Sequence, residues 1–103
     1  MLLSTTEHIT GKEIEILGLV QGNVVQTKSI KKDLKAVRKN FTGGEITEYT
    51  ELLKEAHNIA TERMIQQAKN LDANAIIGIR YSTSNIIESA SEVMAYGTAI
   101  KIK

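Results

Sequence analysis

Two segments near the end of the chain constrain its fold more than any other feature. Residues 71–81 pass from the end of a helical pattern directly into alternating apolar residues, and residues 92–100 form a second run in which Gly97 stands between small residues. Alternation of this kind predicts strands. A face of small residues lets a helix or another backbone approach closely. Both segments are packing elements, and neither holds a set of residues that performs chemistry.

The two predicted strands have apolar residues on both of their faces. In the second strand, the small residues Val93, Ala95, Gly97 and Ala99 share one face, because successive side chains of a strand point to opposite sides. The other face carries larger side chains: Met94, Tyr96, Thr98, Ile100 and Ile102. Helices can cover one face of an antiparallel sheet, and 103 residues leave little chain for the other. We therefore expect a homo-oligomer.

A long helix is predicted before these strands, from about residue 45 to residue 71. Thr42 and Glu45 form a capping box, in which each side chain satisfies a free backbone N–H of the other. The apolar stripe consists of Ile46, Tyr49, Leu53, Ala56, Ala60, Met64, Ala68 and Leu71. A helix of roughly seven turns exceeds what one small sheet covers, so we expect part of it to meet a partner.

The first third of the chain predicts extended structure followed by a short helix. Ile14 and Ile16 alternate with glutamates, while Gly18 and Gly22 indicate a bulge or a tight turn, so residues 13–27 form either one strand or a hairpin. The helical spacing of Ile30, Leu34, Val37 and Phe41 predicts a short amphipathic helix from Ile30 to Asn40. The predicted fold is α+β, with an antiparallel sheet packed against one short and one long helix.

Composition limits the class of protein. The length fits a single domain, residues 1–103, and the formal net charge of +1 gives no general attraction to nucleic acid or to an anionic membrane. The absence of cysteine excludes disulfides, thiol nucleophiles and thiolate metal sites, and it is compatible with the cytoplasm, where we expect the protein. No apolar stretch approaches membrane-spanning length, and the first residues do not form a signal peptide.

Several segments together resemble the YbjQ-like family of small bacterial and archaeal proteins, which carries a heavy-metal-binding label. The shared residues are Thr5-Thr6, residues 17–22, Gly43-Gly44-Glu45 with Tyr49 and Leu52-Leu53, Arg63-Met64, residues 73–81 and residues 92–99. That family usually has glycine at position 72, where this chain has Asp72, a residue that tolerates the left-handed conformation. The resemblance implies a dodecin-like subunit in a homopentameric ring and no established activity.

The residues predict a protein that is not an enzyme. No histidine stands near a serine nucleophile, and no carboxylate pair belongs to an evident pocket. We expect a ring that serves as a scaffold or binds a small ligand at its subunit interfaces, with no cofactor. Arg80 and Glu92 would form an ion pair across the sheet or a subunit boundary, and Arg63 would reach a neighbour's carboxylate. Tyr49 and Tyr96 would be core or interface aromatics.

Heavy-metal binding is the alternative function. Soft metals favour thiolate and thioether ligands, but the chain has no cysteine and Met64 lies on the predicted core stripe. His57 occupies a position where the family more often has arginine, so it does not carry a family site. His8 remains as the candidate ligand for a weakly bound ion, with Glu7, Glu13 or Glu15 of neighbouring chains. The competing interpretation is that all of these side chains are simply solvated.

Two segments could bind anions, but each also has a simpler structural role. Cations concentrate in the short predicted helix as Lys28, Lys31, Lys32, Lys35, Arg38 and Lys39, and in a ring they would form a basic belt. An amphipathic helix needs such a polar face in any case, and no aromatic residue interleaves with the cations, so nucleic acid is not an expected partner. The glycines before Glu45 could receive a phosphate, but the capping box already explains them.

Overall fold

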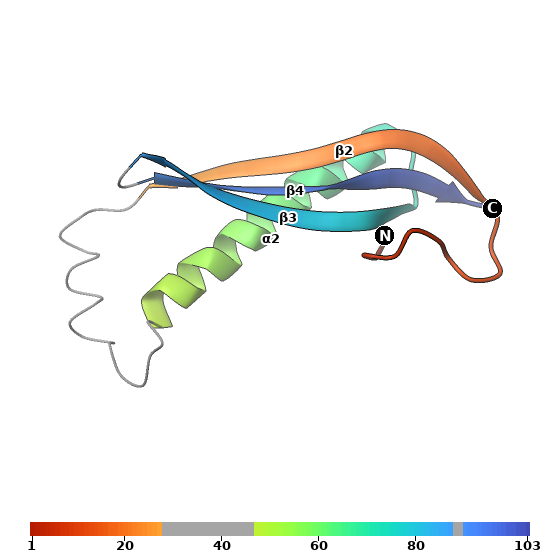
Figure 1. Cartoon of the computed structure of the whole chain (residues 1–103). Coiled ribbons are helices and arrows are strands. Elements are labelled where there is room, and N and C mark those ends of the chain that lie inside the picture. Colours follow the sequence, from red (N-terminus) through yellow and green to blue (C-terminus); the bar gives the residue numbers. More distant parts are fainter. Residues whose placement is uncertain (28–46, 88–89) are drawn as a thin grey trace.

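A computed structural model describes residues 1–27, 47–87 and 90–103 of the chain. In this part the chain forms an α+β domain in which one long helix packs on one face of a four-stranded sheet (Figure 1). The elements are β1 (Leu2–Leu3), β2 (Ile14–Thr27), α2 (Thr47–Asn70), β3 (Ala75–Ile87) and β4 (Ala90–Ile102). The predicted short helix from Ile30 to Asn40, its cations and the capping box lie outside the described residues.

The sheet is mixed, with strand order β1-β3-β4-β2. β4 pairs antiparallel with both β2 and β3, as predicted, but β1 pairs parallel with β3. The prediction of a purely antiparallel sheet is therefore wrong for β1. Its two residues have no pattern of their own, and the strand forms because β3 offers an edge to it: Ser4 N–H donates to Ile76 O at 3.0 Å, and Ile79 N–H donates to Ser4 O at 3.1 Å.

β2 is one long strand and not a hairpin. The predicted bulge is present between Ile16 and Gly18, where the register with β4 shifts and Gly18 has a φ of 144°, a conformation that glycine adopts most readily. Gly22 is not a turn residue. A Cβ atom there would overlap the backbone of Ala60 and Met64 and lie 2.8 Å from Arg63 Cβ. The helix backbone therefore crosses directly over β2.

The main core lies between α2 and the small-residue face of the sheet. On the helix, Ala56, Ala60, Met64 and Ala68 are fully buried, as the stripe predicted. They pack against Val20, Val24, Ile76, Ile79, Val93, Ala95 and Ala99. Small side chains on both sides bring the two layers together closely. Leu53 and Leu71, which flank these buried residues on the stripe, are exposed in the single chain.

The turn from α2 into β3 follows from local hydrogen bonding. Asp72 has a φ of 64°, its N–H donates to Lys69 O at 3.0 Å, and Ala73 N–H donates to Ala68 O at 3.0 Å. This is a Schellman motif, in which a residue in the left-handed conformation ends the helix. Lys101 Nζ lies 3.4 Å from the Asp72 carboxylate and anchors the turn to β4.

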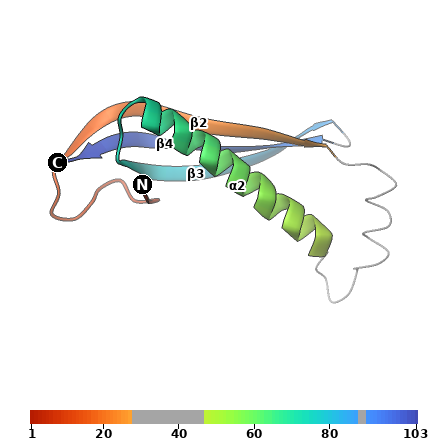
Figure 2. The same ribbon diagram turned by 180° about the vertical axis from the view of Figure 1, so that it is seen from behind.

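Among the described residues, cover on the opposite face of the sheet is confined to one end. There, Ala75, Ile77 and Ile100 form a small second core with the partly buried Ile9, Ile14 and Ile102. Ile9 belongs to the N-terminal segment, which passes beneath this end of the sheet (Figure 2). The molecule measures 52 × 26 × 17 Å, so it is a thin, elongated plate of two layers.

Candidate functional site

The uncovered part of the sheet is the candidate site, and we call it the open face. Pairing across three strands places its side chains in rows: Gln21 with Tyr96 and Arg80, Asn23 with Met94 and Ser82, and Val25 with Glu92 and Ser84. The next row, Leu19 with Thr98 and the buried Ile77, borders the second core. Alternate residues of the same strands, such as Val20 and Ala95, lie under α2. The rows therefore face away from the helix.

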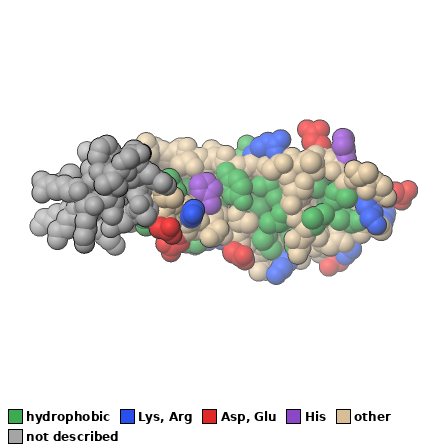
Figure 3. Space-filling view, turned by 90° about the horizontal axis from the view of Figure 1, so that it is seen from below, with side chains coloured by type: hydrophobic (Ala, Val, Ile, Leu, Met, Phe, Trp, Pro, Cys, Tyr) green, Lys and Arg blue, Asp and Glu red, His purple; other side chains and the backbone are tan. Residues whose placement is uncertain are grey.

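The open face combines apolar and hydrogen-bonding side chains. Tyr96, Met94 and Thr98 are half-buried, whereas Leu19 is 72% exposed and Val25 is 53% exposed. The predicted role of Tyr96 as an interface aromatic fits this position, but no contact with a partner tests it. A face that mixes exposed apolar and hydrogen-bonding side chains suits packing against another protein surface or a flat ligand. Figure 3 shows the molecule from below, toward the β3 side of the sheet, with hydrophobic side chains in the middle and charged ones around the margin.

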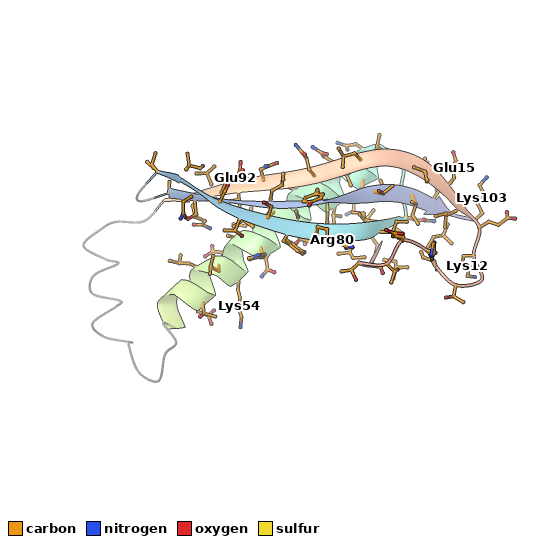
Figure 4. The ribbon with its side chains drawn as sticks, viewed as in Figure 1. Lys12, Glu15, Lys54, Arg80, Glu92 and Lys103 are labelled. Atoms are coloured by element: carbon orange, nitrogen blue, oxygen red, sulfur yellow. The ribbon has the colours of Figure 1, made fainter. Side chains whose placement is uncertain are left out.

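The expected ion pair between Arg80 and Glu92 does not form within the chain. Arg80 lies opposite Tyr96, and Glu92 lies opposite Ser84, so four residues of β4 separate them, or about 13 Å at ~3.3 Å per residue. Figure 4 shows the two side chains at different points along the sheet. Arg80 Nη1 instead donates to Thr5 O at 3.0 Å and to Ile79 O at 2.8 Å.

Two side chains of α2 reach the outer edge of β2. Arg63 Nη1 donates to Asn23 O at 2.6 Å, and Gln67 Oε1 accepts the N–H of Gln21 at 3.0 Å. Arg63 was predicted to reach a neighbour's carboxylate, but in the chain it bonds this backbone carbonyl. A shallow hollow of about 420 Å³ is lined by Asn58, Ile59, Glu62, Arg63 and Gln66. This hollow lies along one helix and contains no converging ligand set.

Sequence reasoning missed a polar cluster between α2 and β3. His57 Nδ1 lies 2.7 Å from Leu53 O, and because a carbonyl only accepts, Nδ1 carries the proton and Nε2 stays free to accept. Thr61 Oγ1 donates to His57 O at 2.7 Å, so the Tyr81 hydroxyl donates to Thr61 Oγ1, also at 2.7 Å. The His57 and Tyr81 rings are 5.2 Å apart. The spacing of His57 and Thr61 by four residues was the available signal.

The candidate metal ligands do not converge in one chain. His8 is exposed, and its backbone carbonyl accepts a hydrogen bond from Thr6 Oγ1 at 2.9 Å. Glu15 lies 3.9 Å from Lys103 Nζ. Within residues 1–27, 47–87 and 90–103, no three His, Cys, Asp or Glu side chains are close enough to hold one ion. Any site that uses His8 would need ligands from other copies. Among the described helices, none is long and apolar enough to cross a bilayer.

A family model and curated relatives identify the family of the chain, and a solved structure shares its fold. A family model described as "Putative heavy-metal-binding" matches residues 1–103. A UPF0145 protein of Vibrio campbellii is 54% identical, covering 99% of both chains, and one of Pseudothermotoga lettingae is 56% identical, covering 100% of this chain and 98% of its own. The crystal structure of a protein of unknown function from Pediococcus pentosaceus, described as belonging to the DUF74 family, superposes with a TM-score of 0.75. It is 18% identical and covers 100% of this chain and 98% of that chain, a likeness that shows the fold.

Proposed function

The chain belongs to the family of UPF0145 proteins, and we propose that it is a non-enzymatic subunit of a homopentameric ring. The ring would act as a scaffold or bind a small ligand at its subunit interfaces, in the cytoplasm. The open face of the sheet carries this proposal, because α2 covers only the other face. The number five rests on the resemblance to YbjQ-like, dodecin-like subunits.

The shape of the single chain supports self-association. Its radius of gyration is 16.9 Å, against about 13 Å for a compact domain of ~100 residues. Large apolar side chains remain exposed along β2, with Ile16 at 69% and Leu19 at 72%. Burying one such side chain is worth about 1.5–3 kcal/mol. Several of them in each interface would offset an association cost of about 4–15 kcal/mol.

A ring follows if two different surfaces of the chain meet. The open face of one copy would pack against α2 of the next copy, where Leu53 is exposed and Ile59 is half-buried. Such a contact is heterologous, and heterologous contacts close into rings when the rotation between copies permits. The long helix and the C-terminal strands would then supply the subunit contacts.

A small ligand would find its best surface in the row of Gln21, Tyr96 and Arg80. In the register of the sheet, Tyr96 pairs with Gln21 on one side and with Arg80 on the other. A flat ligand with hydrogen-bond acceptors could stack on Tyr96 and accept from either neighbour. Covering this row with a second subunit would strengthen these interactions by excluding water.

Native mass spectrometry of protein purified without a chelator tests the proposal. We expect particles that contain five chains, or a whole multiple of five, each chain of 11.3 kDa. The same spectrum would reveal a retained small molecule as added mass. A monomer at micromolar concentration would contradict the ring.

Heavy-metal binding is a second candidate function, favoured by the description of the matching family model. A ring could repeat His8 around its axis and so supply ligands that one chain lacks. Such a site would be weak, based on oxygen and imidazole ligands, and dependent on assembly, since a closed structural site takes four converging ligands. Titration with zinc or copper, described below, separates this function from that of a metal-free ring.

A further inference from the structure

The two long edges of the sheet differ in how they are protected. β2 forms one edge over 14 residues, and β3 forms the other, where β1 pairs with only its first two residues. An edge strand presents unpaired N–H and C=O groups that can add a strand from another chain, and proteins usually blunt such edges. The groups that block each edge therefore indicate which edge is available to pair with a strand of another chain.

The edge of β2 is closed in its middle. Gln67 occupies the outward N–H of Gln21, and Arg63 occupies the outward carbonyl of Asn23. The bulge next to Gly18 interrupts the same edge further back. These two hydrogen bonds and the bulge are the kinds of device that stop a strand from adding to an edge.

The edge of β3 is occupied only up to Ile79. Gly78 N–H donates to Thr6 O at 2.8 Å, and Ile79 N–H donates to Ser4 O at 3.1 Å. Beyond that point, the side chains from Arg80 to Ile87 are all exposed. Among the described residues, no backbone group pairs with the outer side of this stretch.

The outward backbone groups of this stretch can be identified from the sheet register. Gln21 N–H points away from β4, so Tyr96, directly opposite, points its backbone groups toward Arg80 of β3. Residues then alternate, which turns the N–H and C=O of Tyr81, Thr83 and Asn85 outward. The outward N–H of Ile79, bonded to Ser4, agrees with this alternation.

This part of β3 also lacks the residue types that usually prevent a strand from adding to an edge. From Tyr81 to Ile87 it contains no proline and no charged residue, and its middle is Ser82-Thr83-Ser84-Asn85. Two copies of such a stretch can approach without repulsion between like charges. Figure 1 shows this half of the β3–β4 hairpin diverging from the first turns of α2, so the described helix does not obstruct the approach.

We propose that the β3 edge from Tyr81 to Asn85 pairs antiparallel with the same edge of a second copy. The partner is a second copy of this edge because the β2 edge is closed, and because the uncharged stretch can oppose itself with serine and threonine side chains as cross-strand neighbours. The contact is isologous and closes after two copies. It goes beyond the proposed ring, which uses faces of the sheet and helix, and it would join rings in pairs.

The variant Thr83→Pro tests the pairing, since it removes an outward N–H without removing a β3–β4 hydrogen bond. Thr83→Ser is the matched control, because serine keeps both the outward backbone N–H and the hydroxyl group at the same position. We expect native mass spectrometry to show half the wild-type number of chains for Thr83→Pro and an unchanged number for Thr83→Ser. A second variant, Thr83→Lys, should also halve the number at low salt, because it places like charges across the contact.

Circular dichroism of each variant would confirm that the subunit stays folded. An odd number of chains in the wild type, an unchanged number in both Thr83→Pro and Thr83→Lys, or an equal loss in Thr83→Ser would overturn the proposal. The number of chains in the Thr83→Pro particle tests the ring separately. Five chains support both proposals, whereas a change from two chains to one supports the edge contact and refutes the ring.

Discussion

Replacing Gly22 with alanine probes the contact on which the fold depends most. The added methyl group would overlap the backbone of Ala60 and Met64 and lie 2.8 Å from Arg63 Cβ. Neither backbone neighbour can rotate away, so the strain is relieved only if α2 withdraws from β2. That movement would loosen the packing of the fully buried Ala60 and Met64 against the sheet.

The expected loss in the free energy of unfolding lies at the upper end of the range for overpacked cores. Inserting a methylene into a packed interior typically costs about 1–3 kcal/mol. Because the obstacles at Gly22 are backbone atoms, we expect about 3 kcal/mol for Gly22→Ala. With an m-value of about 2 kcal/mol/M for a small domain, the urea midpoint should fall by roughly 1.5 M.

The assay is urea unfolding followed by circular dichroism at a fixed protein concentration, since association shifts apparent stability. Gly11→Ala is the control, because nothing lies within 4 Å of its added Cβ and only its φ of 72° is unfavourable. The control should lose about 1 kcal/mol. An unchanged midpoint for Gly22→Ala, or a loss no larger than that of the control, would refute the reasoning.

Three further substitutions test other parts of the account. Gly97→Val should lower stability by about 1–3 kcal/mol and weaken assembly, because its Cβ would lie 2.9 Å from Ile76 Cγ2 and Ile77 O; unchanged thermal unfolding and particle size would contradict this. Asp72→Gly should raise stability by about 0.5–1 kcal/mol, since glycine adopts a φ of 64° freely, and a lower urea midpoint would show that the contact with Lys101 matters more. In calorimetry with zinc or copper, we expect no tight binding by the wild type, because the described part of one chain supplies no converging ligand set. Tight binding that His8→Ala abolishes would establish the metal function, and tight binding that survives it would identify a different ligand.

Features set by long periodic patterns could be predicted from the sequence. The stripe from Ala56 to Ala68 specifies α2, and the small residues of β4 specify the face that the helix covers. Asp72 ends the helix as expected for a left-handed position. These predictions succeed because each depends on the period of one segment and on the volume of its side chains.

Features that depend on how two segments lie against each other could not be predicted from the sequence in the same way. Gly22 permits a helix crossing and not a turn, which depends on where α2 lies. β1 exists because β3 offers an edge, and Arg80 and Glu92 do not pair within one chain because the strand register sets them four positions apart. Their pairing across a subunit boundary stays a prediction. The cluster of His57, Thr61 and Tyr81 likewise requires knowing which strand residue passes beside the helix.

The open face could be anticipated only in outline. Apolar residues on both sides of the C-terminal strands indicated that one face would need a partner, but the row of Gln21, Tyr96 and Arg80 depends on the register of three strands. The bulge between Ile77 and Arg80 shifts that register by one residue. Periodicity within one strand contains no information about such a shift.

Sedimentation equilibrium of the wild-type protein at micromolar concentration tests the central claim most directly. The claim is that the open face is covered by another copy of the chain in a pentameric ring. We predict a single species whose mass corresponds to five chains, or a whole multiple of five, of 11.3 kDa each. A species of one chain, stable over the whole concentration range, would contradict the account.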